Sequence, residues 1–308
     1  MRVALLAGGT GGAKLAAGMQ EEIGDRLTVI ANTADDVETL GVHVSPDPDL
    51  CTYWLSGEID EERGWGLRDD TFRVMERMAD VGAPNWFSLG DRDLAACLYR
   101  AEFMRAGGRQ TDAQAQIARG LGVEASVLPM CDEAVRTMVL TEHGRRELQE
   151  YLILDGGQPE VHGVELDGIV EARPSAEVAD AFRTADLIVL GPSNPIISIG
   201  PILAVPGVRE AIDASPAPVV AVSPYVGGQI LKGPTNKFME ALGRPTTAAG
   251  VASLYAGLID AMVVDQDDPE GPPAELPTLA AKTLMDGAGG RVRLARTVLD
   301  YGETLIDA

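Results

Sequence analysis

The sequence predicts a doubly wound α/β fold, in which one mostly parallel, Rossmann-like sheet has helices on both faces and carries a small β-rich insertion. Three observations lead to this class. Short apolar runs of strand length alternate with helical patterns along most of the 308 residues. Several of these runs end in Gly, Pro, Ser, Asn or Asp, as expected where a parallel strand turns into a helix. Hydrophobic residues make up 45% of the chain, which is enough for the core of a single large domain spanning 1–308.

The N-terminal stretch contains the clearest strand–turn–helix unit. The apolar run Arg2–Leu6 is followed by a glycine-rich turn, and Ala13–Ile23 has the periodicity of a helix. Glycines let the backbone pass close to a phosphate, and a helix N-terminus attracts anions. The spacing matches neither a Walker A loop nor a complete G-x-G-x-x-G motif, so a tight turn without a ligand is the alternative. We expect a nucleotide or diphosphate site at Gly8, Gly9, Thr10, Gly11, Gly12 and Lys14.

A second buried strand, Leu27–Ala31, runs into the polar segment Asn32–Asp36. Ligands of open parallel sheets collect at the carboxyl ends of the strands. Asp35 and Asp36 could therefore hold Mg²⁺, or one of them could accept a hydrogen bond from a ribose hydroxyl. An Asp-rich turn or helix cap is the alternative.

The next part of the chain predicts loops rich in charge. Prolines in Ser45–Asp49 predict an irregular loop that carries two more carboxylates. The charged and glycine-broken segment Glu61–Asp70 is expected to be a lid or rim, and Thr71–Val81 an amphipathic helix.

A third strand is expected at Trp86–Leu89, before a helix at Leu94–Arg105. Arg92 lies at their junction, where it could meet an anion or pair with the aspartates beside it. Another helix is expected at Thr111–Leu121 and another strand at Ser126–Met130.

The pattern changes at about residue 132, where alternating segments predict antiparallel strands. The segments are Val135–Thr141, Leu148–Leu154 and Val161–Leu166. They form the expected β-rich insertion, roughly 132–172, packed on the core.

Two further loops follow buried strands. The strand Asp186–Leu190, which comes after a helix at Ser175–Thr184, enters Gly191–Pro195. The strand Val219–Val222 enters a glycine- and lysine-rich segment that begins at Ser223. The polar groups that we expect to face a phosphate or base are those of Gly191, Ser193, Asn194, Ser223 and Lys232.

The C-terminal part predicts a helix, a strand, an acidic loop and two more helices. Their ranges are Val251–Ile259, Ala261–Val264, Asp265–Pro277, Leu279–Met285 and Val292–Leu299.

Charge and composition limit the classes of function. The net charge of −22 argues against non-specific nucleic-acid binding, which needs a positive field. Lys14, Lys232, Lys237 and Lys282 are the only lysines, and the first three lie in or beside glycine- or proline-rich loops, where they could meet phosphates. An acidic, lysine-poor surface suits a medium of high ionic strength, which screens self-repulsion.

Cysteine usage and hydropathy predict a cytoplasmic protein. Cys51, Cys97 and Cys131 are odd in number and far apart, which suits buried thiols in a reducing compartment better than disulfides or a zinc site. No apolar run approaches the roughly 20 residues of a membrane span. Met1 leads directly into the first strand, so no signal peptide is expected.

An ordered set of motifs resembles the 2-phospho-L-lactate transferases, which make the deazaflavin coenzyme F-420. The similarity runs from Met1 to about Val264 with similar spacing. The motifs are Gly8-Gly9-Thr10-Gly11-Gly12-Ala13-Lys14, Asn32-Thr33-Ala34-Asp35-Asp36, Ser45-Pro46-Asp47-Pro48-Asp49, Trp65-Gly66, Asp70-Thr71-Phe72, Leu89-Gly90-Asp91-Arg92-Asp93, Leu128-Pro129-Met130, Gly191-Pro192-Ser193-Asn194-Pro195 and Ser223-Pro224.

The resemblance implies a reaction. The acceptor would be the deazaflavin alcohol Fo and the donor lactyl-2-diphospho-5′-guanosine, or its enolpyruvyl analogue in some relatives. The terminal ribityl hydroxyl would attack the distal phosphorus, GMP would leave, and Mg²⁺ would be required. A homodimer is plausible.

By the same resemblance, Asp36 and Asp49 are the expected catalytic and metal-binding residues, and Asp49, Ser88 and Arg92 are expected at Fo. Relatives can carry a basic residue at the position of Ser88, so Arg92 is the better candidate for a charge there. The nucleotide and its diphosphate are expected at Gly8 to Gly12, Lys14, Asn32, Gly191, Ser193, Asn194, Ser223 and Lys232.

Two alternative functions remain open. Nucleotide-sugar-binding regulators of the same superfamily share the Gly-Gly-Thr-Gly-Gly start and would carry out no transfer. An NAD-dependent oxidoreductase is the other class, but the broken G-x-G-x-x-G pattern and the lack of a clear proton-shuttling His or Tyr count against it.

Overall fold

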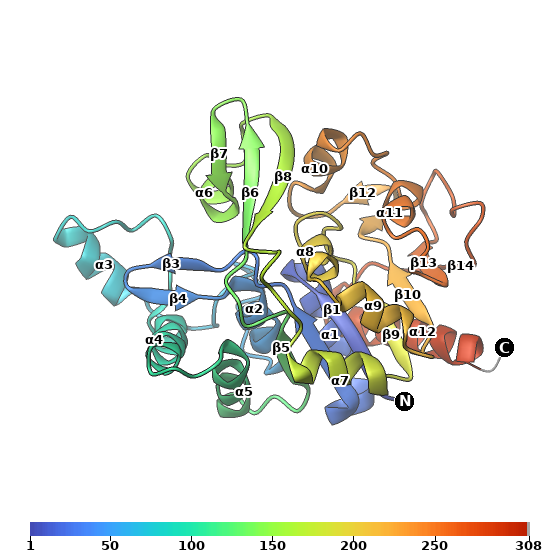
Figure 1. Cartoon of the computed structure of the whole chain (residues 1–308), viewed down its shortest axis with the longest axis horizontal. Helices are drawn as coiled ribbons and strands as arrows, with labels where there is room; N and C mark the ends of the chain where they lie inside the picture. The colour runs from blue at the N-terminus through green and yellow to red at the C-terminus, as the bar shows by residue number, and fades with distance from the viewer. Residues whose placement is uncertain (307–308) are drawn as a thin grey trace.

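The computed structural model, which describes residues 1–306, is organised around a sheet of seven parallel strands (Figure 1). The strand order across this sheet is β14-β13-β10-β9-β1-β2-β5. The strands are β1 (Val3–Ala7), β2 (Leu27–Ala31), β5 (Ser126–Pro129), β9 (Leu187–Leu190), β10 (Val219–Val222), β13 (Ala261–Asp265) and β14 (Thr278–Ala281).

The order of the strands places one crevice in the middle of the sheet. From β1 the chain winds outward through β2 to β5, and then returns to β9 on the other side of β1. The three central strands pair without a bulge, and Leu5 on β1 lies beside Val29 on β2 and Val189 on β9. The reversal leaves an opening beyond the carboxyl ends of β1 and β9, which is where doubly wound sheets bind ligands. The predicted doubly wound α/β fold is confirmed.

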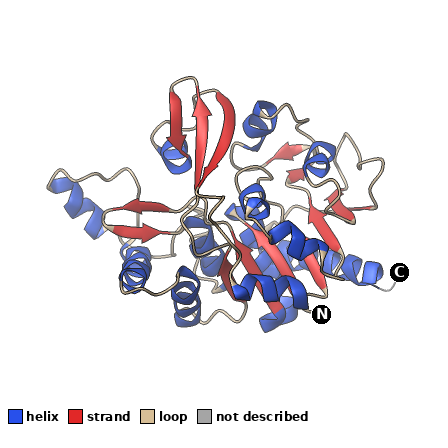
Figure 2. Ribbon diagram, in the orientation of Figure 1, coloured by secondary structure: helices blue, strands red, loops and turns tan. Residues whose placement is uncertain are grey.

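Helices cover both faces of this sheet (Figure 2). On β1, Leu5 belongs to the core on one face and Leu6 to the core on the other, so both faces are dry. Burial on both sides explains why the strands read as continuous apolar runs. The helices on the first face are α1 (Gly9–Ile23), α2 (Pro46–Leu55) and α12 (Gly287–Ile306). Those on the second face are α7 (Ala176–Thr184), α8 (Ile199–Ala204), α9 (Val208–Asp213), α10 (Thr235–Ala241) and α11 (Ala248–Leu254).

The long C-terminal helix α12 lies directly against α1. A Cβ atom on Gly18 would lie 2.4 Å from the carbonyl oxygen of Arg291, so the two backbones can approach this closely only because residue 18 is glycine. Leu294, Ala295 and Val298 form the buried stripe of α12. Within residues 1–306, no helix combines the length and the apolar character that crossing a membrane requires.

The connection between β2 and β5 forms an arm with a small core of its own. Figure 1 shows the hairpin of β3 and β4 extending to one side of the main sheet, with α3 and α4 beside it. Buried Val44, Met75, Leu89 and Cys97 belong to this separate core. The elements of the arm besides α2 are β3 (Val37–Thr39), β4 (Val42–Val44), α3 (Arg73–Asp80), α4 (Asp91–Arg105) and α5 (Gln110–Gly120).

The β-rich insertion is present as a three-stranded antiparallel sheet in the order β7-β6-β8. It stands above the main sheet in Figure 1. Its expected middle strand, Leu148–Leu154, is wrong, because Leu148 and Tyr151 are buried at helical spacing and the segment forms α6. The elements are β6 (Arg136–Thr141), β7 (Gly144–Glu147), α6 (Leu148–Ile153) and β8 (Val161–Asp167). The remaining short elements are the 3₁₀ turn η1 (Gly24–Arg26) and the hairpin β11 (Tyr225–Val226) with β12 (Gln229–Ile230).

Three other local predictions are wrong. Trp86–Leu89 is not a strand, since no neighbouring strand pairs with it and its side chains line a cavity. The segment Leu279–Met285 is not a helix, because Thr278–Ala281 pairs in parallel with β13. Ser45–Asp49 is not an irregular loop: Pro46 takes the first position of α2, where a missing N–H costs nothing.

Candidate active site

Two loops interlock in the crevice between β1 and β9. The Gly8 N–H donates to Ser193 Oγ over 3.2 Å. A Cβ on Gly11 would lie 2.1 Å from Pro192 O, and a Cβ on Gly12 would lie 2.5 Å from Ser193 Oγ. Close contact between protein loops therefore already requires glycine at residues 11 and 12. Gly9 differs from them, because it has a φ of +61° and open space on the side where a Cβ would be.

Asp47 is the carboxylate nearest to this turn, although it is not among the residues expected at the site. Its Oδ1 accepts from the Gly9 N–H over 2.7 Å, and its Oδ2 accepts from Asn32 Nδ2 over 3.0 Å. Burial raises the pKa of Asp47 to about 6, although the hydrogen bonds from Asn32 and Gly9 oppose this shift. A carboxylate of the chain thus occupies a backbone donor that the sequence analysis assigned to a phosphate.

Asp35 is a further buried carboxylate near Asp47. Its Oδ1 has no hydrogen-bond partner among residues 1–306. Burial, followed by the charge of Asp47, raises its pKa well above the usual range.

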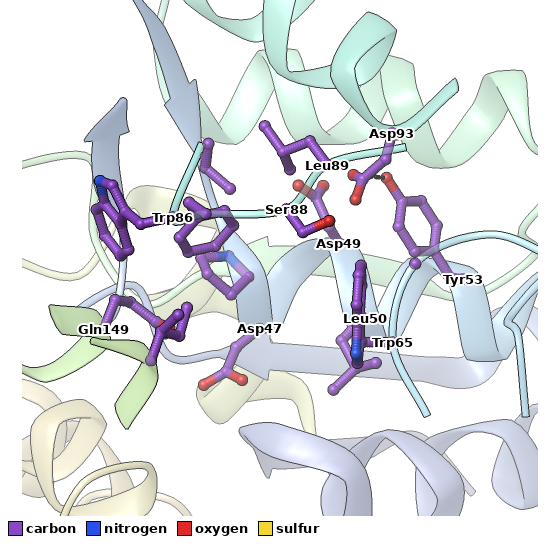
Figure 3. Close-up of a pocket in the computed structure, with 15 residues that line it drawn as sticks. Asp47, Asp49, Leu50, Tyr53, Trp65, Trp86, Ser88, Leu89, Asp93 and Gln149 are labelled. Atoms are coloured by element: carbon purple, nitrogen blue, oxygen red, sulfur yellow. Dashed lines mark hydrogen bonds between the residues drawn. The ribbon is translucent and has the colours of Figure 1, made fainter. Parts of the chain in front are cut away.

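A cavity of about 430 Å³ opens beside Asp47 (Figure 3). Aromatic rings and carboxylates dominate its lining, and Ser88 and Gln149 add neutral polar groups. Such a cavity suits a flat ring system that carries hydroxyl groups, because rings pack on rings and hydroxyls donate to carboxylates. The aromatic residues are Tyr53, Trp65, Trp86 and Phe87, and the acidic ones are Asp47, Asp49 and Asp93.

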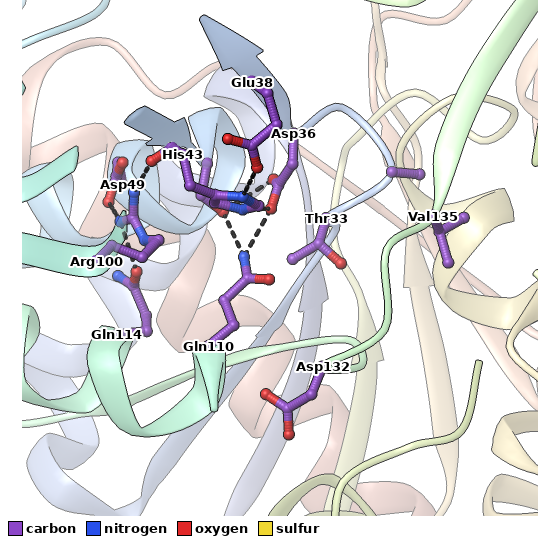
Figure 4. Close-up of polar contacts among 12 residues, drawn as sticks. Thr33, Asp36, Glu38, His43, Asp49, Arg100, Gln110, Gln114, Asp132 and Val135 are labelled. Atoms are coloured by element: carbon purple, nitrogen blue, oxygen red, sulfur yellow. Dashed lines mark hydrogen bonds and ion pairs between the residues drawn. The ribbon is translucent and has the colours of Figure 1, made fainter. Parts of the chain in front are cut away.

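Asp49 forms a buried ion pair with Arg100 at the edge of this cavity (Figure 4). The guanidinium of Arg100 is fully buried and also donates to His43 O over 3.2 Å and to Gln114 Oε1 over 3.0 Å. Burial raises the pKa of Asp49, and Arg100 opposes the shift. Asp49 Oδ2 is buried and has no hydrogen-bond partner within the described part of the chain, so one of its oxygens is not engaged by the protein.

Asp93, the second carboxylate at this point, was not among the predicted site residues. It accepts from the Tyr53 hydroxyl over 2.7 Å, and burial together with the charge of Asp49 raises its pKa to about 7. Ligand atoms of Asp49, Asp93 and Cys97 all lie within 4.8 Å of one another. The Gly90–Asp93 motif was the available signal, but the choice fell on Arg92.

Asp36 is held by three hydrogen bonds (Figure 4). Its Oδ2 contacts His43 Nε2 at 2.8 Å and accepts from Gln110 Nε2 over 2.6 Å, while its Oδ1 accepts from Ser45 Oγ over 2.9 Å. Burial lowers the pKa of His43, but the bonds to Asp36 and Glu38 outweigh it and raise the pKa to about 9. Both oxygens of Asp36 are therefore engaged, in contrast to those of Asp49.

The structure separates Ser88 from Arg92. Ser88 lines the aromatic cavity, whereas Arg92 lines a second, more open groove of about 400 Å³. Tyr53 borders both spaces. Arg92 pairs with Glu58, so neither predicted partner, Asp91 or Asp93, forms an ion pair with its guanidinium among residues 1–306.

The remaining predicted polar residues serve the loops in different ways. Asn194 Oδ1 accepts from the backbone of Ile196 and Ile197, which makes it a turn residue, and Ser223 Oγ accepts from the Tyr225 N–H. A Cβ on Gly191 would lie 2.9 Å from Leu6 O, so close packing requires glycine at this position as well.

Lys237 does not face a phosphate. Its ammonium donates to the carbonyl oxygens of Gly157, Gln158 and Pro159 and so ties α10 to the insertion.

The family model described as 2-phospho-L-lactate transferase CofD matches residues 3–282. The 2-phospho-L-lactate transferase of Methanosarcina acetivorans is 40% identical over 86% of this chain and 86% of its own length. The phosphoenolpyruvate transferase of Streptomyces griseus is 38% identical over 98% of this chain and 99% of its own.

A solved structure supports the fold alone. The crystal structure of a UPF0052 family member from Bacillus halodurans is similar, with a TM-score of 0.63 at 19% identity, over 97% of this chain and 98% of that one.

Proposed function

This chain belongs to the 2-phospho-L-lactate transferase family and is a transferase, and from this premise we propose its substrates. We propose that it moves a 2-phospholactyl or phosphoenolpyruvyl group from a guanosine diphosphate ester to the ribityl hydroxyl of the deazaflavin Fo and releases GMP. The observation that carries the proposal is the position of Asp47, which contacts the Gly9 turn of the crevice and also lines the aromatic cavity.

The aromatic cavity suits the acceptor. A deazaflavin is a planar ring system with a polyhydroxylated tail, and the rings of Trp65, Trp86 and Phe87 offer packing surfaces for it. The tail would donate hydrogen bonds to Asp49 and Asp93. Ser88 would contact Fo as a neutral donor or acceptor. Arg92, which lines the other groove, would act on Fo only through Tyr53 and its surroundings.

The crevice suits the donor. Ser193 and Asp47 already accept from the Gly8 and Gly9 N–H groups, so the donors proposed here are the N–H groups that follow them in the first turn of α1, where a helix N-terminus favours an anion. We assign the diphosphate to this turn and to Lys14, and the rest of the nucleotide to the loops after β2, β9 and β10. The residues proposed at the nucleotide are those expected from the sequence: Gly8 to Gly12, Lys14, Asn32, Gly191, Ser193, Asn194, Ser223 and Lys232.

A donor in the crevice and an acceptor in the cavity would meet beside Asp47. The oxygen of the ribityl hydroxyl would form a bond to the distal phosphorus and give up its proton, and the bond from that phosphorus to the bridging oxygen would break. GMP would leave with the electron pair, and the proton would be released as a second product. Transfer of this kind depends mainly on positioning and on neutralised charge. The aromatic walls would keep water from competing with the hydroxyl.

Magnesium fits Asp49 and Asp93, two carboxylates of the cavity lining that we call the cavity floor. Mg²⁺ takes oxygen ligands, usually one or two carboxylates besides phosphate and water. Asp49, with its unpartnered Oδ2, is the better of the two metal ligands expected from the sequence, and Asp93 lies beside it. Asp36 would instead hold His43 and Gln110 in place. When bound, the ion would neutralise charge on the diphosphate.

The test is to incubate the protein with Fo, Mg²⁺ and each guanylated donor in turn, and to measure the coenzyme product and GMP. Relatives of both names are similar to this chain, so both donors are needed. Product with at least one donor is expected, and absence of product with both would refute the proposal.

A binding measurement separates the enzyme from a regulator. GDP should stabilise the fold by about 2.7 kcal/mol at about a hundredfold excess over its dissociation constant, and UDP-sugars and NAD by much less. Equal stabilisation by a UDP-sugar, without transfer, would favour the regulator. The homodimer stays a prediction, which sedimentation can check.

A further inference from the structure

Three cations from distant parts of the chain converge near the indole of Trp54. Lys14 Nζ lies 5.3 Å from the centre of this ring, and Arg291 Cζ lies 4.9 Å from it. Lys232 lies close enough to Lys14 for its charge to act on that ammonium, and a Cβ on Gly64 would lie 2.7 Å from Lys232 Nζ. Burial lowers the pKa of Lys14; the charge of Glu61 opposes this shift, and the charges of Arg291 and Lys232 add to it. We call Lys14, Lys232 and Arg291 the cation cluster.

The cation cluster has too few carboxylates around it. Within residues 1–306, neither Lys14 nor Lys232 forms an ion pair, although the whole chain holds 47 acidic residues against 25 basic ones. Arg291 pairs with Glu61 at 3.1 Å, and the Glu61 side chain is 53% exposed. Arg291 Nε is buried and has no hydrogen-bond partner in the described part of the chain. One solvated carboxylate thus faces three cations, which repel one another unless an anion joins them.

The fold explains how the cluster is assembled next to the crevice. Gly18 allows α12 to lie against α1 and so brings Arg291 to Trp54. Lys14 lies in the second turn of α1, and side chains of a helix tilt toward its N-terminus, which is here the turn at the crevice. Lys232 comes from the loop between β12 and α10.

We propose that the cation cluster binds the phosphate groups of the donor nucleotide, and that a phosphate oxygen takes the place that the Glu61 carboxylate holds at Arg291. Glu61 is then a stand-in anion that competes with the ligand. This inference rests on the proposed function in one respect, namely that the donor is a guanosine diphosphate ester. It adds Arg291 and Glu61, from outside the crevice loops, to the donor site.

The test is calorimetric titration of the full chain with GDP, with guanosine and with inorganic pyrophosphate. Lys232→Met removes an exposed charge that would contact a phosphate, and it should weaken GDP binding by about fivefold to tenfold, on the order of 1–1.4 kcal/mol. Glu61→Gln should tighten GDP binding by about threefold or more, because it removes the competing anion. Arg244→Met, which removes an exposed charge elsewhere, is the matched control and should change nothing. Guanosine affinity should be the same in all variants.

The opposite changes in GDP affinity expected for Lys232→Met and Glu61→Gln distinguish phosphate binding from a purely structural role. If the wild type binds GDP, but Lys232→Met leaves the affinity unchanged or Glu61→Gln weakens it, the cation cluster only fastens α12 to α1 and the inference is overturned. If the wild type neither binds GDP nor transfers from a guanylated donor, the proposed function fails by itself. The pyrophosphate arm still tests the cluster in that case: weakening by Lys232→Met supports it, and no change overturns it.

Discussion

Replacing Asp49 by asparagine tests both the stability and the chemistry assigned to the cavity floor. The change keeps the size of the side chain and removes its charge, so the fully buried Arg100 is left with neutral acceptors alone, among them His43 O and Gln114 Oε1. Leaving one charge of a buried ion pair uncompensated costs about 3–5 kcal/mol. We therefore expect the free energy of unfolding of Asp49→Asn to fall by about this amount.

Turnover should fall independently of stability. Asp49 carries the unpartnered oxygen that we assign to the metal and to the acceptor, so its loss should slow transfer at least about a hundredfold, on the order of 2.7 kcal/mol of transition-state stabilisation. GDP affinity should change far less, because we assign GDP to backbone N–H groups of the crevice and to the cation cluster, and not to Asp49. The assays are denaturant unfolding, turnover with Fo across a range of Mg²⁺, and GDP titration, all at a temperature where the variant is folded.

A double variant tests whether the loss of stability comes from the unpaired charge of Arg100. Asp49→Asn combined with Arg100→Met removes both charges, and it should unfold with a smaller loss of free energy than the sum of the single variants. Asp180→Asn is the matched control, because Asp180 forms an exposed pair with Arg183 and such pairs contribute about 0–1 kcal/mol. Wild-type stability together with near-normal turnover in Asp49→Asn would refute the reasoning about the cavity floor.

Three further predictions follow from other parts of the structure. Gly11→Ala places a Cβ against Pro192 O and should lower the free energy of unfolding by about 1–3 kcal/mol in denaturant unfolding. Gly120→Ala is the control, because its Cβ meets open space, and it should be neutral or slightly stabilising. Equal effects of the two changes would contradict the interlocked loops. Because the pKa of His43 is raised in the folded protein, its stabilising contribution is complete below the unfolded pKa of about 6.5 and is lost as pH rises through about 9. The wild type should therefore lose stability between about pH 7 and pH 10, and His43→Gln should lack this loss. Parallel stability profiles of the two proteins would rule out this role of His43. The net charge of −22 predicts a higher unfolding midpoint in molar KCl than in dilute buffer, and an unchanged midpoint would remove the inference about ionic strength.

The sequence by itself determined the fold class and the crevice, because both depend on local patterns. A strand buried on both faces must be apolar throughout, and polar or glycine-rich loops must follow it where the chain turns into a helix. The loops after β1 and β9 could therefore be named as neighbours before any contact was known. Segments without a strict period, such as Leu279–Met285, were assigned wrongly, because pairing with β13 decides their conformation.

Only the tertiary structure decided which polar groups are free to act. Whether a polar group is free depends on its burial and on partners elsewhere in the chain, which local sequence patterns do not show. Both oxygens of Asp36 are bonded, by His43, Ser45 and Gln110, whereas Asp49 keeps one oxygen unpartnered. Arg92, which belongs to the Gly90–Asp93 motif, lines the other groove and pairs with Glu58. Arg291 reaches Trp54 only because α12 packs on α1, since the position of a side chain far along the sequence depends on how helices pack and on no pattern in its own neighbourhood.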